Sequence, residues 1–131
     1  MTSPDFASLS AEPYVLLTTF RASGIAVSTP VWIVEGRDGL LVTTSGESGK
    51  VKRIRRNATV ELTPCDARGV IAAGTRAIQG IASVHTDANS RVAIDAALDR
   101  KYGLRYKAIK AAGRLRGAAQ KSVVVRIAPE A

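Results

Sequence analysis

Alternating apolar and polar positions over the first third of the chain predict a series of short antiparallel strands. Residues 14–20 are rich in β-branched and aromatic side chains, which favour a strand. Residues 25–34 alternate between two faces, and the Ser23-Gly24 turn before them predicts a hairpin with the preceding strand. A tight turn at 36–39 leads into residues 40–44, which form the third expected strand. The pattern therefore indicates three successive strands before the first helix.

The remainder of the chain predicts further strands separated by short helices. Ser48 is a typical N-cap, so a helix is expected over residues 48–57. A second helix is expected to begin near Asp87 and to end at Gly103. Further strands are expected at 59–63, 76–85 and 122–127, with Gly80 as a bulge or close-packing point in the second of them. The segment 69–74 is expected to be a loop or a short strand, and the segment 104–115 a helix or a basic loop. Residues 1–11 are expected to form a loose N-terminal arm with a helical turn near 6–9.

The predicted order of elements is β-β-β-α-β-β-α-β, within one domain that spans residues 1–131. A chain of this length buries a real hydrophobic core. Antiparallel hairpins with only short helices between them favour a mainly β fold. We therefore expect a small barrel or sandwich with peripheral helices rather than a doubly wound sheet.

The charge of the chain is strongly positive and clustered. The net charge is +8, and eight cations lie between Arg100 and Lys121 with no acid among them. This distribution favours a polyanionic partner, namely nucleic acid, an anionic surface or a negatively charged cofactor. The alternative is that these cations only solvate an exposed face.

Composition excludes several kinds of site. A single histidine, His85, and a single cysteine, Cys65, provide no metal-ligand set and no intrachain disulfide. Aromatic residues make up 5% of the chain, too few for a stacking platform that binds nucleic acid. No apolar run approaches the ~20 residues that span a bilayer. The N-terminus has no secretory signal pattern, so we expect a cytoplasmic protein without a membrane span.

The strongest chemical signal is the segment 43–57, where small polar residues lead into a very basic helix. The helix contains five cations and no acid: Lys50, Lys52, Arg53, Arg55 and Arg56. At its start, Gly49 permits close approach of a ligand, and the free N–H groups and the helix dipole suit a phosphate. Lys50 adds a charge in the first turn. The segment therefore predicts an anion site; the alternative is a capped helix that only faces solvent.

The spacing of the helix assigns different directions to its cations. Val51 and Ile54 form a narrow apolar stripe, and Lys50 lies beside that stripe. The cations expected to point further away are Lys52, Arg53 and Arg56. The glycine and lysine positions do not have the spacing of a nucleoside-triphosphate P-loop.

The segment 28–32 is unusual for a strand. Pro30 removes a backbone donor, and the small polar residues Ser28 and Thr29 precede it. Either a ligand lies against this strand, or the strand is an edge strand in which the proline prevents aggregation.

Taken in order, these segments resemble a known family. The residues that carry the resemblance are Tyr14-Val15-Leu16-Leu17-Thr18-Thr19-Phe20-Arg21, Val27-Ser28-Thr29-Pro30-Val31-Trp32, Ser48-Gly49-Lys50-Val51-Lys52-Arg53-Ile54-Arg55-Arg56-Asn57, Val60-Glu61-Leu62-Thr63-Pro64-Cys65-Asp66 and Arg100-Lys101-Tyr102-Gly103. The series is similar to the pyridoxamine 5′-phosphate oxidase-like flavin and deazaflavin superfamily, and within it to the F(420)-dependent group called FDOR-B. The resemblance covers roughly residues 12–128.

The resemblance implies a split β-barrel of the FMN-binding type, which forms a homodimer with a cofactor groove at the dimer interface. It implies that the first strands contact the ring system and that the basic helix start holds phosphate. The implied cofactor-binding residues are Ser28, Thr29, Pro30, Val31 and Trp32 beside the deazaflavin ring; Thr43, Thr44 and Ser45 at its hydroxylated chain; and Ser48, Gly49, Lys50 and Arg56 at its phosphate.

The activity that the resemblance implies is hydride transfer from reduced F(420) to an unsaturated or quinone-like small molecule. The cofactor supplies the reaction and the protein positions it, and no side chain stands out as catalytic. The oligoglutamate tail of F(420) also gives the charge of +8 a polyanionic counterpart. Three alternatives remain open: an FMN-dependent oxidoreductase, a non-catalytic carrier of such a cofactor or of a tetrapyrrole, and a basic β-barrel that binds nucleic acid.

Overall fold

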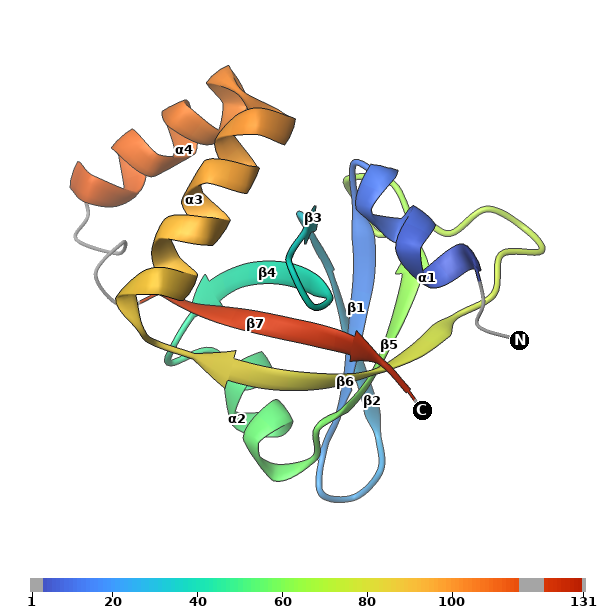
Figure 1. Ribbon diagram of the computed structural model, residues 1–131. Helices are drawn as coiled ribbons and strands as arrows, with labels where there is room; N and C mark the ends of the chain where they lie inside the picture. The colour runs from blue at the N-terminus through green and yellow to red at the C-terminus, as the bar shows by residue number, and fades with distance from the viewer. Residues whose placement is uncertain (1–3, 116–121, 131) are drawn as a thin grey trace.

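The computed structural model describes residues 4–115 and 122–130. Within these ranges, seven strands form one antiparallel sheet in the order β2-β1-β5-β6-β7-β4-β3. The strands are β1 (Val15–Phe20), β2 (Ala26–Val31), β3 (Val34–Glu35), β4 (Leu40–Ser45), β5 (Thr59–Pro64), β6 (Ile78–His85) and β7 (Ser122–Pro129). Figure 1 shows β4, β6 and β7 running steeply across β1, β2 and β5, so that the sheet curls into a half-barrel. The expected mainly β fold with peripheral helices is confirmed.

The helices lie around this curled sheet. They are α1 (Pro4–Ser8) with the 3-10 turn η1 (Leu9–Ala11), α2 (Gly49–Arg56), α3 (Ala88–Tyr102) and α4 (Leu104–Leu115). Asp87 caps α3 by accepting a hydrogen bond from the backbone of Ser90, and Gly103 ends it with a φ of 57°, which favours glycine. The segment 104–115, expected as a helix or a basic loop, is a helix, and Figure 1 shows α3 and α4 together on one side of the molecule.

One expectation about the strands needs correction. The segment 25–34 is not one continuous strand, because β2 ends at Val31 and Trp32 and Ile33 connect it to the two-residue strand β3. These two strands lie at opposite edges of the sheet. For the segment 69–74, expected as a loop or a short strand, the loop alternative is confirmed, because the segment lies in the connection between β5 and β6.

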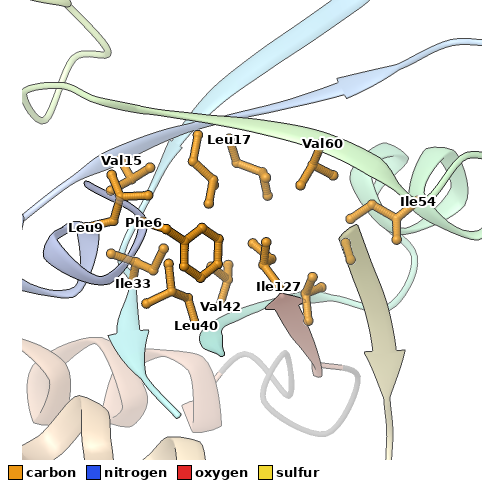
Figure 2. Packing of buried hydrophobic residues seen from close by; sticks show 13 residues of the cluster. Phe6, Leu9, Val15, Leu17, Ile33, Leu40, Val42, Ile54, Val60 and Ile127 are labelled. Carbon is orange, nitrogen blue, oxygen red and sulfur yellow. The ribbon is translucent and has the colours of Figure 1, made fainter. Parts of the chain in front are cut away.

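Residues 4–11 contain the helical turn expected near 6–9, but Phe6 and Leu9 belong to the core, which corrects the expectation of a loose arm for this described part. Phe6 is 8% exposed and Leu9 is 1% exposed. Figure 2 shows the Phe6 ring among buried side chains of the barrel, including Ile33, Leu40 and Ile127. The α1–η1 segment therefore closes one end of the half-barrel through its apolar side chains.

Close packing explains the glycine in β6. A Cβ atom on Gly80 would lie 2.7 Å from Cγ2 of Ile127 and 3.0 Å from the carbonyl oxygen of Ala128. The expected close-packing role of Gly80 is confirmed. A second buried cluster joins α3 to β3, β4 and β7, and it consists of Val34, Leu41, Ile94, Ala97, Leu98, Tyr102 and Val124.

Candidate functional site

The start of α2 follows directly from the end of β4. The backbone N–H of Ser48 donates to the carbonyl of Ser45 at 3.1 Å, and the Ser48 hydroxyl accepts from the N–H of Val51 at 3.3 Å. Ser48 is thus the N-cap that the sequence predicts. Because Val51 and Ile54 are buried against the barrel, the helix start is fixed relative to the sheet. A fixed helix start presents its first N–H groups and its positive dipole end to an anion.

Arg53 folds back over this helix start. Its Nε atom donates a 2.6 Å hydrogen bond to the hydroxyl of Thr19, and a Cβ atom on Gly49 would lie only 2.6 Å from its Nη1 atom. Arg53, which was expected to point further from the apolar stripe than Lys50, is therefore held against β1 and over Gly49. A buried acceptor on β1, 34 residues away in sequence, sets the direction of this side chain.

Lys50 is the second cation at the same place. Its side chain is half-buried, and burial, followed by repulsion from Arg53, lowers the pKa of its amine below the ordinary value of 10.5. The ion pairs formed among the described residues involve neither Lys50 nor Arg53. An anion bound here would gain from both charges and would relieve their mutual repulsion.

The other three cations of α2 are more exposed than the two at the helix start. Lys52, Arg55 and Arg56 are exposed. Arg56 is the last residue of the helix, and seven residues of α-helix separate it from Gly49 by about 10 Å along the axis. The structure therefore places Arg56 away from the helix start that Ser48, Gly49 and Lys50 form.

The hydroxyl residues of β4 lead to the same helix start. Thr43 donates from its hydroxyl to the carbonyl of Val123 at 3.3 Å, and Ser45 accepts from the N–H of Glu47 at 3.3 Å. Thr43 and Thr44 are partly buried and Ser45 is exposed, so accessibility increases toward α2.

Segment 28–31 forms most of the edge strand β2, which among the described strands pairs only with β1. Ser28 is exposed, and its hydroxyl lies 2.8 Å from that of Thr18. The Thr29 hydroxyl is buried and has no partner among the described residues. Pro30 is exposed, and Val31 packs against the core. Ser28 and Pro30 therefore present one face of this edge, whereas Thr29 and Val31 face the barrel interior.

Trp32 lies beyond the end of β2 and packs against the helices. Its ring stacks on that of Tyr102 with the centroids 4.1 Å apart and the planes 5° apart. The guanidinium carbon of Arg105 lies over the Trp32 ring at 5.3 Å from its centroid. The indole is thus held between an aromatic ring and a cation of the α3–α4 pair.

Adjacent residues of β1 join the two parts of the candidate site. Thr18 bonds Ser28 of the edge strand, and Thr19 bonds Arg53, whose side chain covers the start of α2. Both threonine side chains are buried, at 6% and 0% exposure. Sequence reasoning missed Thr18, Thr19 and Arg53. The available signal was the four-residue spacing of Gly49 and Arg53, which places a side chain over a residue that lacks one.

The basic segment that begins at Arg100 is partly neutralised. The Lys107 amine lies 3.7 Å from a carboxylate oxygen of Asp99, and the Lys110 amine lies 3.6 Å from one of Asp95. Asp95 also accepts a hydrogen bond from the hydroxyl of Tyr106. Acids on α3 therefore offset two cations of α4; residues 116–121 of the segment lie outside the described part of the chain.

Other kinds of site find no support in the described ranges. Residues 4–115 and 122–130 contain no group of three or more His, Cys, Asp or Glu side chains that could hold a metal ion. None of the helices described is long and apolar enough to cross a membrane. His85 bonds the hydroxyl of Ser83 at 2.7 Å. Burial and the neighbouring Asp66 raise the pKa of the Cys65 thiol, which disfavours the nucleophilic thiolate.

Comparisons with solved structures show the same fold over nearly the whole chain. The haem storage protein HutZ from Vibrio cholerae is 17% identical, with a TM-score of 0.65 over 99% of this chain and 91% of that one. An F(420) reductase is 18% identical, with a TM-score of 0.64 over 96% of this chain and 94% of that one. A conserved hypothetical protein from Mycobacterium tuberculosis is also 18% identical, with a TM-score of 0.70 over 100% of this chain and 82% of that one.

A search of curated proteins finds no match. A family model described as pyridoxamine 5′-phosphate oxidase matches residues 5–131. The match includes the curled sheet, the edge strand β2 and the cationic start of α2. The chain therefore belongs to the pyridoxamine 5′-phosphate oxidase family.

Proposed function

We propose that this protein is an F(420)-dependent oxidoreductase that reduces an unsaturated or quinone-like small molecule. The observation that carries the proposal is the start of α2, where Arg53 lies over Gly49, Lys50 follows in the first turn, and neither cation forms an ion pair among the described residues. The donor set of helix N–H groups, amine and guanidinium fits a phosphodiester. The similar fold of an F(420) reductase supports this choice of cofactor.

Residues of three elements would share the binding of the cofactor: the start of α2, strand β4 and the edge strand β2. Ser48, Gly49, Lys50 and Arg53 would hold the phosphate, and Thr43, Thr44 and Ser45 would line the path of the hydroxylated chain. The edge strand from Ser28 to Val31 would lie beside the ring, with Trp32 at its end. When bound, F(420) supplies a hydride from its reduced deazaflavin ring; the chain's own residues bind and orient the reacting partners.

We propose further that the protein works as a homodimer in which the groove is shared between two subunits. The support is geometrical. The edge strand β2 exposes Ser28 and Pro30 on one face, and a second subunit would cover such a face and enclose a ring that a single half-barrel leaves open to solvent.

Titration of the purified protein with F(420), FMN and haem, each followed by quenching of its single tryptophan, tests the cofactor. We expect F(420) to bind most tightly, because its anionic tail adds to the phosphate contact. The protein is then loaded with chemically reduced F(420) and mixed with menadione, and the oxidation of the reduced F(420) is followed by fluorescence. Tight F(420) binding without turnover of any quinone or enone would favour a carrier, and preferential binding of FMN or haem would contradict the choice of cofactor.

A further inference from the structure

The connection between the two edges of the sheet is held by a helix instead of by a neighbouring strand. Trp32 and Ile33 lie between β2 and β3, outside the strand ladder. Ile33 is completely buried, so its backbone N–H and C=O groups need partners. Both partners are side chains at the end of α3, 68 and 69 residues away in the sequence.

Lys101 and Tyr102 supply these partners, and we call the two residues the α3 clasp. The Lys101 amine donates to the carbonyl oxygens of Ile33 at 2.5 Å and Glu12 at 2.7 Å. The Tyr102 hydroxyl accepts from the N–H of Ile33 at 3.1 Å and donates to the carbonyl of Pro13 at 2.9 Å. The clasp thus joins the entrance to β1 and the exit from β2 to one helix end.

The same tyrosine also sets the orientation of Trp32. Its ring lies parallel to the indole at 4.1 Å, and Arg105 of α4 covers the indole as well. The φ of 57° at Gly103 ends α3 and lets the chain turn directly into α4, which brings Arg105 back over the clasp. Trp32 is therefore fixed by contacts to α3 and α4.

We propose that Lys101 and Tyr102 are positioning residues, which hold the end of the edge strand β2 and the indole of Trp32 in the geometry that the cofactor groove requires. This inference rests on the proposed function only where it predicts an effect on F(420) binding. Among the described strands β2 has a neighbour on one side alone, β1, so the clasp adds a second support just beyond the end of β2 at Val31. Neither residue would touch the reacting atoms; both act through the backbone of Ile33 and the ring of Trp32.

The test uses Lys101→Met, Tyr102→Phe and the double variant, with Lys107→Met and Tyr106→Phe as matched controls on α4. The control side chains form their ion pair and hydrogen bond with α3, not with the segment around Ile33. Acrylamide quenching of Trp32, the only tryptophan, reports its mobility without any ligand, and titration gives the F(420) affinity. Thermal unfolding identifies the temperature at which all variants remain folded.

We expect the double variant to quench more readily than the wild type and to bind F(420) about five- to tenfold more weakly, with both controls unchanged. Unchanged quenching in the double variant overturns the inference. Increased quenching with wild-type affinity for F(420) overturns its link to the cofactor groove. If the wild type itself does not bind F(420), the proposed function fails, and quenching alone decides the role of the clasp.

Discussion

The Nε atom of Arg53 donates a 2.6 Å hydrogen bond to the hydroxyl of Thr19, whose side chain is completely buried in β1. An arginine held in this way keeps its remaining N–H groups over the start of α2 before any ligand arrives. Its rotamer freedom is already restricted, so binding an anion costs less side-chain entropy than it would for a free surface arginine.

Arg53→Gln should therefore weaken F(420) binding strongly. A charge-assisted contact to phosphate contributes about 1.5–3 kcal/mol, which corresponds to roughly a ten- to hundredfold loss of affinity. Arg55→Gln removes the same charge from an exposed position of the same helix and should cost much less. Fluorescence titrations at one fixed salt concentration compare the two variants, and equal losses would show that overall charge, not position, determines binding.

Thr19→Val should produce a smaller loss of affinity than Arg53→Gln. The valine preserves the shape of the buried side chain but removes the acceptor, so the guanidinium remains charged and becomes mobile. Titration of F(420) into this variant measures how much affinity depends on the fixed position of Arg53, because the charge of Arg53 is retained. An affinity as poor as that of Arg53→Gln would mean that the charge is useful only when Thr19 holds it, and wild-type affinity would show that positioning is unimportant.

Lys50→Ala should weaken F(420) binding, whereas Lys52→Ala should leave it almost unchanged, because Lys50 is half-buried beside Arg53 and Lys52 is exposed. The pKa of Lys50 is lowered from 10.5 in the free protein, and a bound anion favours the charged amine and raises that pKa again. Affinity should therefore fall as the pH rises through the lowered pKa of Lys50. Titrations from pH about 7 to about 10 measure this fall, which should be absent from Lys50→Ala.

The N-terminal segment gives a prediction about stability. Phe6→Ala removes a ring that is 8% exposed within the barrel core, and such a truncation costs about 3–5 kcal/mol of the free energy of unfolding. Leu104→Ala is the control, because Leu104 is 82% exposed. Urea unfolding followed by circular dichroism compares the two variants. A loss below about 1 kcal/mol for Phe6→Ala would mean that the segment is only loosely attached.

Local patterns predicted most of the sheet and the ends of the helices, because strand alternation and helix caps depend on residues close together in the sequence. Ser48, Asp87 and Gly103 have the roles that their residue types favour. The features that the sequence did not predict depend on contacts between residues far apart in the chain. Phe6 became a core residue through contact with strands far along the chain, and Arg53 turned toward a threonine 34 residues before it. Propensity within a segment carries no information about either contact.

The proposed dimer predicts a dependence of cofactor binding on protein concentration. If two subunits share the groove, dilution below the dimer dissociation constant should release F(420), because each half-barrel retains only part of the site. Light scattering during gel filtration gives the mass, and titrations at several protein concentrations give the coupling. A stable monomer with full affinity for F(420) would contradict the shared groove.

The ion pairs between α3 and α4 predict that two cations of the basic segment contribute little to F(420) binding. Lys107 and Lys110 lie 3.7 and 3.6 Å from the carboxylates of Asp99 and Asp95, so their charges are offset before an oligoglutamate tail arrives. The Lys107–Asp99 pair is exposed and the Lys110–Asp95 pair is partly exposed; exposed pairs contribute about 0–1 kcal/mol to stability, and salt weakens them further. The double variant Lys107→Gln/Lys110→Gln should therefore remain folded and bind F(420) within about threefold of the wild type, whatever the tail length. Titrations with F(420) of two tail lengths, at low and at high salt, measure this directly. A loss of affinity that grows with tail length and disappears at high salt would instead show that the tail displaces the aspartates and binds these lysines.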